Sequence, residues 1–324
     1  MIDNHKIHAQ LNNLLIDATI AELPNHYKGK VRDTYVLNDG RIIIIATDRQ
    51  SAFDKTLASV PFKGQVLTQL SRFWFEATSD ICDNHVIAYP DPNVTICKSL
   101  EMLPIEIIVR DYITGSTNTS IWSMYRDGAR EIYGISLPDG LCKNQKLPET
   151  IITPTTKANH GEHDVPITSS EIVKQGILTK KEWDDLVTKS LAVFARGREW
   201  ATKQGLILVD TKFEFGRDEN GNFCLADEIL TPDSSRYWSK ESYLGKIKAE
   251  EEPEGLDKEF LRLWINDRCN PYKDKIPPIP EDTLIEFSRR YIKLFETITG
   301  QTFIVNDSGV KVIDRIRANL AQFF

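Results

Sequence analysis

The strongest constraint on the fold is an alternating segment at residues 206–215, with the sequence LILVDTKFEF. Successive side chains of a β-strand point to opposite faces of a sheet. As a strand, this segment presents Asp210, Lys212 and Glu214 on one face and mostly apolar side chains on the other. Folding alone does not require three ionisable groups in a row. The segment therefore predicts a half-buried strand whose polar face carries a functional site.

An Asn-Gly dipeptide at 220–221 predicts a two-residue hairpin turn that joins this strand to residues 222–229. Such a turn places Glu214 opposite Asp227. Two facing carboxylates repel each other, and a divalent cation would convert this repulsion into binding, because Mg²⁺ favours one or two protein carboxylates together with substrate phosphates. We therefore expect a magnesium site at Glu214 and Asp227. An exposed salt-bridge ladder through Lys212 is the alternative, and a one-residue slip of the turn would remove the pairing.

Hairpins and helices are mixed along the chain without regular strand–helix–strand winding, which predicts an α+β fold. The patterns predict strands at 28–37, 41–47, 104–113, 205–215 and 222–229, of which the first two form a hairpin around Asn38-Asp39-Gly40. Helices are predicted at 5–22, 64–79, 117–126, 169–176, 179–204, 256–268 and 281–299. Residues 134–166 are rich in Pro, Gly, Lys and Thr and are expected to be mostly loop. The tail at 302–324 is expected to form a short strand and a helix.

Composition limits the classes of function. The formal net charge is −7, which disfavours a protein that coats nucleic acid. No apolar run approaches the ~20 residues that span a bilayer, and residues 1–10 lack the apolar core of a signal peptide. The five cysteines are scattered and form no CxxC pair, which argues against disulfides and structural zinc. We expect a cytoplasmic protein without a nucleic-acid or membrane partner; a monomer and a homo-oligomer both remain open.

The first basic segment, YKGKVRD at 27–33, places Lys28, Lys30 and Arg32 on one face of a strand. Gly29 allows the backbone to approach a ligand closely. Such a strand can lie over nucleotide phosphates, although no GxxxxGK[ST] loop occurs in the chain. A solvated basic strand is the simpler alternative.

Two further segments carry candidate phosphate ligands. In IVRDYITGS at 108–116, Arg110 follows a strand and Ser116 opens a predicted helix, whose N-terminus could bind an anion. In LTPDSSRYW at 230–238, Arg236 follows the acidic strand and Asp233 lies in the preceding turn. The alternatives are an ordinary serine cap with a surface arginine in the first segment, and a helix cap followed by a core tryptophan in the second.

Two loops complete the candidate residues. The segment TPTTKANHGEHD at 153–164 contains two histidines and acids, but it has no helical HExxH and no cysteine partner, so we favour a substrate-covering loop in which Lys157 contacts phosphate over a zinc site. A polar surface loop is the alternative. In ATDRQSAFD at 46–54, Asp48 and Ser51 could meet substrate, or they could only form local turn hydrogen bonds.

Taken together, these segments resemble the SAICAR synthetase family. The matching pieces are GKVRDTY, ATDRQSAFD, PIEIIVRDYITGS, TPTTKANHGEHD, LILVDTKFEFG and DEILTPDSSRYW, in family order from about residue 27 to residue 238. The inserted loop at 153–164 is similar to that of the longer, fungal-type members. The resemblance implies an ATP-dependent ligase of purine biosynthesis, which joins carboxyaminoimidazole ribonucleotide (CAIR) and L-aspartate through an acyl phosphate. The products would be SAICAR, ADP and phosphate.

The resemblance also implies roles for individual residues. Mg²⁺ would be held by Glu214 and Asp227, and Asp210, Lys212 and Asp233 would line the reacting centre. The nucleotide would be bound by Lys28, Gly29, Lys30, Arg32, Met102, Leu103, Glu106 and Lys157. The ribonucleotide would be gripped by Arg110, Ser116 and Arg236, with Asp48 and Ser51 as further substrate contacts.

The implied fold has a kinase-like, β-rich nucleotide-binding part at 1–110 and an α+β part at 111–324, with ATP in the cleft between them. Two other functions compete with the ligase. A small-molecule kinase would share the phosphate ligands and the metal site but would not need aspartate. A non-catalytic nucleotide-binding regulator would bind ATP without turnover, and three charged positions on one strand face favour an enzyme over it.

Overall fold

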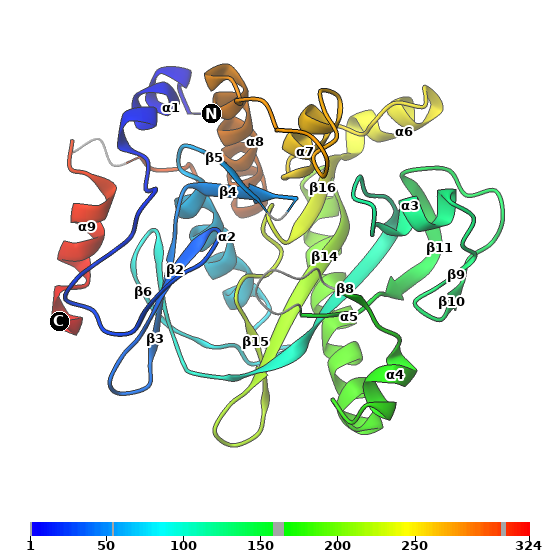
Figure 1. The fold of residues 1–324 in the computed structure, drawn as a ribbon, viewed down its shortest axis with the longest axis horizontal. Helices are drawn as coiled ribbons and strands as arrows, with labels where there is room; N and C mark the ends of the chain where they lie inside the picture. Colours follow the sequence, from blue (N-terminus) through cyan, green and yellow to red (C-terminus); the bar gives the residue numbers. More distant parts are fainter. Residues whose placement is uncertain (1, 54, 158–164, 306–308) are drawn as a thin grey trace. The chain divides into compact units, whose positions relative to one another are not determined.

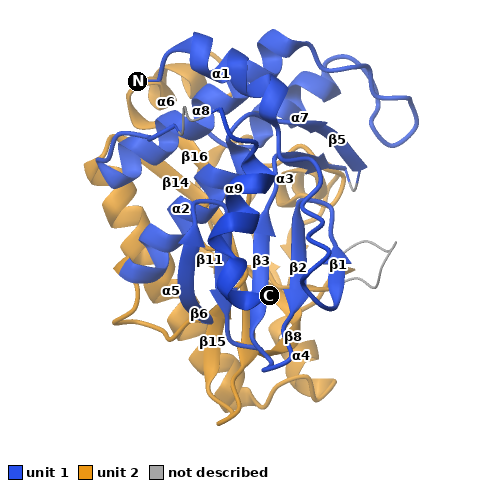
Figure 2. Ribbon diagram, turned by 90° about the vertical axis from the view of Figure 1, so that its left-hand side faces the viewer, with its two compact units in different colours: residues 1–76, 85–99, 256–324 blue, residues 77–84, 100–255 orange. Residues whose placement is uncertain are grey.

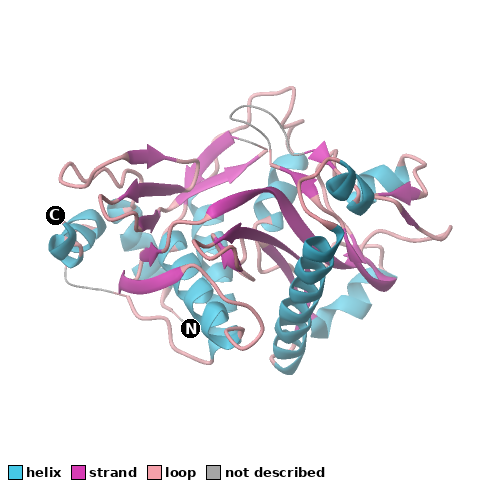
Figure 3. Ribbon diagram, turned by 90° about the horizontal axis from the view of Figure 1, so that it is seen from below, coloured by secondary structure: helices cyan, strands magenta, loops and turns pink. Residues whose placement is uncertain are grey.

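The computed structural model describes residues 2–53, 55–157, 165–305 and 309–324, and it combines helices with antiparallel sheets (Figures 1 and 3). This confirms the α+β class. The chain divides into two units (Figure 2): unit 1 comprises residues 1–76, 85–99 and 256–324, and unit 2 comprises residues 77–84 and 100–255. Residue 110, the predicted domain boundary, lies inside strand β8 (Glu101–Ile113) of unit 2.

Unit 1 is built on a five-stranded antiparallel sheet of order β1-β2-β3-β7-β6. Its strands are β1 (His26–Lys28), β2 (Arg32–Val36), β3 (Ile42–Ala46), β6 (Val86–Asp91) and β7 (Val94–Cys97). The predicted hairpin between β2 and β3 is confirmed, and Gly40 adopts the left-handed conformation that its turn needs (φ +83°). The strand predicted at 28–37 is instead two strands, because the chain reverses at 29–31.

A second ribbon and, among the residues that the structure describes, five α-helices complete unit 1. The ribbon pairs β4 (Arg49–Ala52) with β5 (Lys55–Ser59). The helices are α1 (Asn4–Gln10), α2 (Lys63–Ala77), α7 (Glu259–Asn266), α8 (Glu281–Thr299) and α9 (Val312–Asn319). The helix predicted at 5–22 therefore ends early, after a short 3₁₀ turn at Leu11–Asn13. The apolar residues that follow contribute to the core from an irregular segment.

The two ends of the chain share one hydrophobic core with the sheet of unit 1. Leu15 and Ile20 from the first segment and Val312, Ile316 and Leu320 from α9 belong to this cluster. The sheet supplies the remaining members, which include Tyr35, Ile43, Ile45, Val94 and Ile96. The helix expected in the tail is thus confirmed as α9 and packs into the core of unit 1, whereas the described residues of the tail contain no strand.

This packing predicts an asymmetry between neighbouring positions of α9. Ile316 is fully buried, so Ile316→Ala should lower the free energy of unfolding by about 2–4 kcal/mol through the cavity that it leaves. Arg317→Ala is the matched control, because the Arg317 side chain is 58% exposed and its ion pair with Glu22 lies at the surface. Urea unfolding measures both changes, and equal losses would show that α9 is not packed as described.

Unit 2 is built on a seven-stranded sheet centred on two long antiparallel strands, β8 and β14 (Leu206–Arg217). The other strands are β11 (Gln145–Ile152), β12 (Thr155–Thr156), β13 (Val165–Pro166), β15 (Phe223–Ala226) and β16 (Ser235–Ser239). A separate ribbon pairs β9 (Glu131–Ile132) with β10 (Ile135–Ser136). The expectation of a mostly irregular segment at 134–166 is therefore wrong for its described part, because β11 and β12 pair with β8.

The helices of unit 2 are α3 (Ile121–Arg126), α4 (Ser169–Lys174), α5 (Lys180–Lys203) and α6 (Lys240–Lys248). A capping box of Thr179 and Glu182 begins α5. Gly197 allows α5 to approach the sheet closely, since a Cβ atom there would lie 2.8 Å from Leu230 Cδ1 and 3.1 Å from Leu208 Cδ2. Within the part of the chain that the structure describes, no helix has the length and apolar character needed to cross a bilayer.

Candidate active site

The register between β8 and β14 gathers ionisable side chains on one face of the unit 2 sheet. Asp210 is paired with Arg110, and Glu214 is paired with Glu106. Since side chains alternate along each strand, Lys212 shares this face with Asp210 and Glu214. Its ammonium group indeed contacts the carboxylates of Glu106 and Glu214. The sheet thus brings two acids into direct opposition, but the partner of Glu214 is Glu106.

Lys212 relieves the repulsion between these carboxylates. Its Nζ donates to Glu106 Oε1 at 2.5 Å and to Glu214 Oε1 at 2.6 Å, and Lys157 forms a further ion pair with Glu214. Burial disfavours the charge on Lys212, but Glu214, Glu106 and Asp227 outweigh it and raise the pKa of Lys212 above its ordinary value. Burial likewise opposes the charge of Glu214, but Lys212 and Lys157 hold the pKa of this carboxyl well below its usual range. Lys212 and Glu214 are therefore both charged at neutral pH.

The predicted pairing of Glu214 with Asp227 is wrong by one residue. In the structure Glu214 pairs with Ala226, because the hairpin loop closes between Asp218 and Asn222. The loop has three residues, with Gly221 at its left-handed position (φ +80°), in place of a two-residue Asn-Gly turn. Asp227 follows the end of β15 with a φ of +60°, and its charge still acts on Lys212. The metal-site hypothesis thus loses its ladder geometry, while its two carboxylates stay near the same lysine.

Asp210 is shared by two arginines from the neighbouring strands. Arg110 of β8 and Arg236 of β16 each donate Nη1 to Asp210 Oδ2 at 2.6 Å. The Nε of Arg110 also donates to Thr153 Oγ1 at 2.9 Å, a partner that the sequence did not reveal. The shared carboxylate of Asp210 thus holds two guanidinium groups side by side, and their planar donor forks suit an anion such as phosphate.

Ser116 and Asp233 lie on loops of unit 2. The predicted helix does not begin at Ser116, because α3 starts at Ile121 with Ser120 as its N-cap. The loop nevertheless reaches the arginine pair, since a Cβ atom at Gly115 would lie 3.6 Å from Arg236 Nη2. Asp233 is buried, and its amide donates to Thr231 Oγ1. Both residues therefore stay candidates on the basis of the loops that carry them.

The other nucleotide-binding candidates differ in exposure. On β8, Met102 is exposed and Leu103 is buried, and Glu106 is engaged by Lys212. Lys157 directly follows β12 and is half-buried. The rest of its segment, including His160, Glu162 and His163, lies outside the described residues. Among the residues that are described, no group of three or more His, Cys, Asp or Glu side chains is arranged to hold a metal ion.

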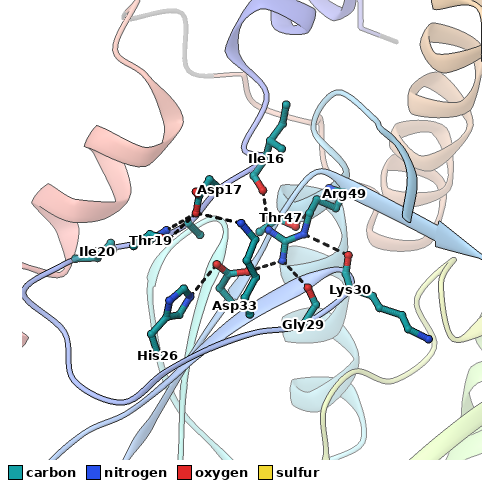
Figure 4. Close-up of polar contacts among 12 residues, drawn as sticks. Ile16, Asp17, Thr19, Ile20, His26, Gly29, Lys30, Asp33, Thr47 and Arg49 are labelled. Atoms are coloured by element: carbon teal, nitrogen blue, oxygen red, sulfur yellow. Dashed lines mark hydrogen bonds and ion pairs between the residues drawn. The ribbon is translucent and has the colours of Figure 1, made fainter. Parts of the chain in front are cut away.

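Unit 1 carries the basic segment as a tight turn between β1 and β2. Lys28 and Lys30 are exposed and Arg32 is half-buried. The predicted single strand is therefore wrong, because Lys28 ends β1, Lys30 lies in the loop (Figure 4) and Arg32 begins β2. Gly29 is required there, since a Cβ atom would lie 2.8 Å from the Arg32 carbonyl oxygen.

The two substrate candidates on the following segment differ in role. Asp48 is buried, and its two carboxylate oxygens accept the backbone N–H groups of Leu15 and Gly64. Burial raises the pKa of Asp48 to about 6. These contacts favour the structural alternative for Asp48, as a link between segments of unit 1. Ser51 is half-buried on β4, where it pairs with Thr56.

The ion pairs of Glu214 predict a specific dependence of stability on pH. Because the folded pKa of Glu214 is lowered, its stabilisation is complete above its unfolded pKa near 4.5 and is lost as the pH falls below that value. Glu214→Gln should therefore lower the unfolding free energy by about 1–3 kcal/mol at pH 7 and by less at pH 3.

Urea unfolding of the wild type and the variant at both pH values measures this difference. Glu149→Gln is a matched control on β11 of the same sheet, where the glutamate is exposed, and it should change the stability by less than about 0.5 kcal/mol. A loss for Glu214→Gln that is equal at pH 3 and pH 7 would contradict the ion pairs described above.

Comparison with known proteins gives a consistent result. A family model described as SAICAR synthetase matches residues 25–279. A protein of Agrobacterium fabrum named "Putative phosphoribosylaminoimidazole-succinocarboxamide synthase 2" is 56% identical over 311 residues, which cover 96% of this chain and 98% of that protein.

Solved structures show the same fold. A SAICAR synthase of Saccharomyces cerevisiae, described as complexed with SAICAR, has a TM-score of 0.76 and 30% identity, covering 90% of this chain and all of that chain. A second structure, described as a Type-2 SAICAR synthetase in complex with ADP, has a TM-score of 0.66 and 26% identity over 87% of this chain and all of that chain. The higher score for the yeast protein agrees with the expected longer type.

Proposed function

The chain belongs to the SAICAR synthetase family, and we propose that it joins CAIR to L-aspartate at the expense of ATP, through an acyl phosphate. It is an ATP-dependent ligase with phosphoribosylaminoimidazole-succinocarboxamide synthase activity, and it acts in purine biosynthesis. The observation that carries the residue assignments is the division of one sheet face in unit 2 into two charged groups. One is the arginine pair Arg110 and Arg236 around Asp210, and the other is the lysine–acid group of Lys157, Lys212, Glu106 and Glu214.

The arginine pair is proposed to bind the phosphate of the ribonucleotide. Two guanidinium groups that share one carboxylate are held in place before the ligand arrives, which reduces the entropy that binding costs. Their planar forks suit phosphate oxygens. Ser116, on the loop beside Arg236, is proposed to add a hydroxyl donor. Ser51 and Asp48 are weaker candidates for substrate contact, and the buried amide bonds of Asp48 argue against it.

The lysine–acid group is proposed to serve the nucleotide and the reacting carboxylate. Glu214 and Asp227 offer the hard oxygen donors that suit Mg²⁺. The ion pairs of Glu214 with Lys157 and Lys212 support this proposal, because they place cationic groups at the same carboxylate. When bound, Mg²⁺ would neutralise charge on the triphosphate. Met102, Leu103, Glu106 and Lys157 are proposed to contact the nucleotide, as are Lys28, Gly29, Lys30 and Arg32 of unit 1.

The proposed reaction has two steps. A carboxylate oxygen of CAIR attacks the γ-phosphorus of ATP, and the bond to the bridging oxygen breaks to release ADP. The aspartate amine then attacks the acyl carbon, the C–O bond to phosphate breaks with its electron pair, and the amine loses a proton. Lys212, with Asp210 and Asp233 beside the reacting centre, is proposed to stabilise the charge that develops on the transferring phosphoryl group. We also propose that the reaction takes place in the cytoplasm.

Release of ADP tests the proposed function directly. With ATP, Mg²⁺ and CAIR, sustained ADP release should require L-aspartate, and the succinocarboxamide should form in equal amount. A coupled assay for ADP, with mass spectrometry of the product, measures both quantities. Sustained ADP release without aspartate would identify a kinase, and nucleotide binding without turnover would identify a regulator.

The arginine pair yields a second prediction. Arg110→Ala or Arg236→Ala removes a charge-assisted hydrogen bond of about 1.5–3 kcal/mol to the ribonucleotide phosphate, so the KM for CAIR should rise about 10- to 100-fold. The KM for ATP should change less than about twofold. Arg126→Ala is the control, because that arginine is exposed and pairs only with Asp127 in the contacts described. Equal increases in both KM values would count against this assignment.

A further inference from the structure

In the turn between β1 and β2, every carbonyl from residue 29 to residue 32 accepts a hydrogen bond within unit 1. The carbonyls of Gly29 and Lys30 accept from the guanidinium of Arg49 (Figure 4). The Val31 carbonyl accepts from the hydroxyl and the amide of Thr47, and the Arg32 carbonyl accepts from the amide of Gly29. The conformation of this turn is therefore fixed from one side by β3–β4 residues.

Arg49 makes two of these contacts from a buried position. It begins β4, and its side chain is only 6% exposed. Its Nη2 donates to the Gly29 carbonyl at 2.9 Å, its Nε to the Lys30 carbonyl at 3.2 Å and its Nη1 to the Ile16 carbonyl at 2.7 Å. A buried guanidinium bound to three backbone carbonyls holds the turn and the segment at residue 16 together.

Asp33 supplies the negative charge that offsets the cost of burying the Arg49 guanidinium. Its carboxylate is fully buried and pairs with Arg49 Nη2, while its other oxygen contacts His26 Nε2 at 3.0 Å. A buried arginine without such a partner would be strongly destabilising. The pair also lets the remaining donors of Arg49 point to neutral carbonyls. Arg49 is thus placed to shape the turn, while the buried carboxylate of Asp33 neutralises its charge.

The orientation of the carbonyls determines where the backbone amides of the turn point. In a trans peptide the C=O and N–H groups point in opposite directions, and no cis peptide occurs among the described residues. Since the carbonyls of Gly29 and Lys30 point toward Arg49, the amides of Lys30 and Val31 point away from it. Successive amides on one side of a turn form a concave anion site. The exposed Lys28 and Lys30 side chains add positive charge to the same turn.

We propose that Arg49 is a positioning residue for nucleotide binding: it holds the 29–32 turn in the conformation whose backbone amides and lysines contact the ATP phosphates. This inference rests on the proposed function, which assigns Lys28 to Arg32 to the nucleotide. Arg49 itself touches no substrate in this account. A lysine could neutralise Asp33, but its single ammonium cannot reproduce the forked contacts to two consecutive carbonyls.

The test compares Arg49→Lys with the wild type by calorimetric titration with Mg–ADP and, separately, with SAICAR. The dissociation constant for Mg–ADP should rise about tenfold, which corresponds to about 1.4 kcal/mol, and that for SAICAR should stay within about twofold. Hydrogen exchange of the amides at 29–32 should become faster, because the turn loses its anchor. A merely structural role would weaken both ligands alike, and an unchanged Mg–ADP affinity would also overturn the proposal.

Two further variants separate this inference from the proposed function. Gly29→Ala disturbs the turn directly, because its Cβ would meet the Arg32 carbonyl. If Gly29→Ala weakens Mg–ADP and Arg49→Lys does not, the turn binds nucleotide but Arg49 does not position it. If neither variant weakens Mg–ADP, the assignment of the turn to the nucleotide is wrong, and the inference falls with it.

Arg41→Lys is the matched control, since Arg41 lies at the exposed hairpin of the same sheet and pairs with Asp39. It should alter neither affinity. If Arg49→Lys does not fold, the double variant Arg49→Gln with Asp33→Asn takes its place, because it removes both buried charges together. The same tenfold loss for Mg–ADP alone is expected from it, and its absence in the folded double variant would overturn the proposal.

Discussion

The opposition of Glu106 and Glu214 across β8 and β14 is the constraint on which the site in unit 2 depends. Two carboxylates on adjacent strands are unfavourable unless a cation lies between them. Here the ammonium of Lys212 lies between them, and Lys157 forms a further ion pair with Glu214. A sheet that only needed stability could replace these groups by apolar residues with little loss. Their presence is explained if, during turnover, the lysines contact phosphate and the carboxylates that they release bind a metal ion.

The same strand also separates two kinds of chemistry. Asp210 lies four residues before Glu214 on β14, which corresponds to about 13 Å along an extended strand. Around Asp210 the planar guanidinium groups of Arg110 and Arg236 meet, whereas Glu214 is surrounded by lysines and a second acid. One rigid strand can therefore hold an anion-binding group and a metal-binding group at a fixed spacing. Such preorganisation is what a reaction between two bound substrates requires.

Much of this could be predicted from the sequence because it follows from short-range rules. The alternation at 206–215 correctly gave β14 and its polar face, and Asn38-Asp39-Gly40 correctly gave a hairpin. The partner of Glu214 was missed because the loop after β14 has three residues and not two, which shifts the register by one. The opposition of Glu106 depends on the pairing of β8 with β14, two strands about a hundred residues apart. No local pattern encodes that pairing, although Glu106 and Arg110, four residues apart, are expected on the same face of their own strand.

Long-range packing likewise explains the other differences. Arg49 looked like part of a polar turn, and only the fold brings Gly29, Lys30 and Asp33 to its guanidinium. The tail from residue 312 has ordinary helical periodicity, and its place in the core of unit 1 depends on the sheet that it covers. A motif also cannot reveal a role that depends on backbone contacts. In the sequence Asp48 is only an acidic residue, whereas in the fold its carboxylate accepts the amides of Leu15 and Gly64.

The most direct test of the central claim is to locate the metal by anomalous diffraction from crystals grown with Mn²⁺ and ADP. The account predicts one manganese peak bound by the carboxylates of Glu214 and Asp227 and by the ADP phosphates, with the ammonium of Lys212 turned toward those phosphates. A manganese peak distant from both carboxylates, with Lys212 still held between Glu106 and Glu214, would contradict it.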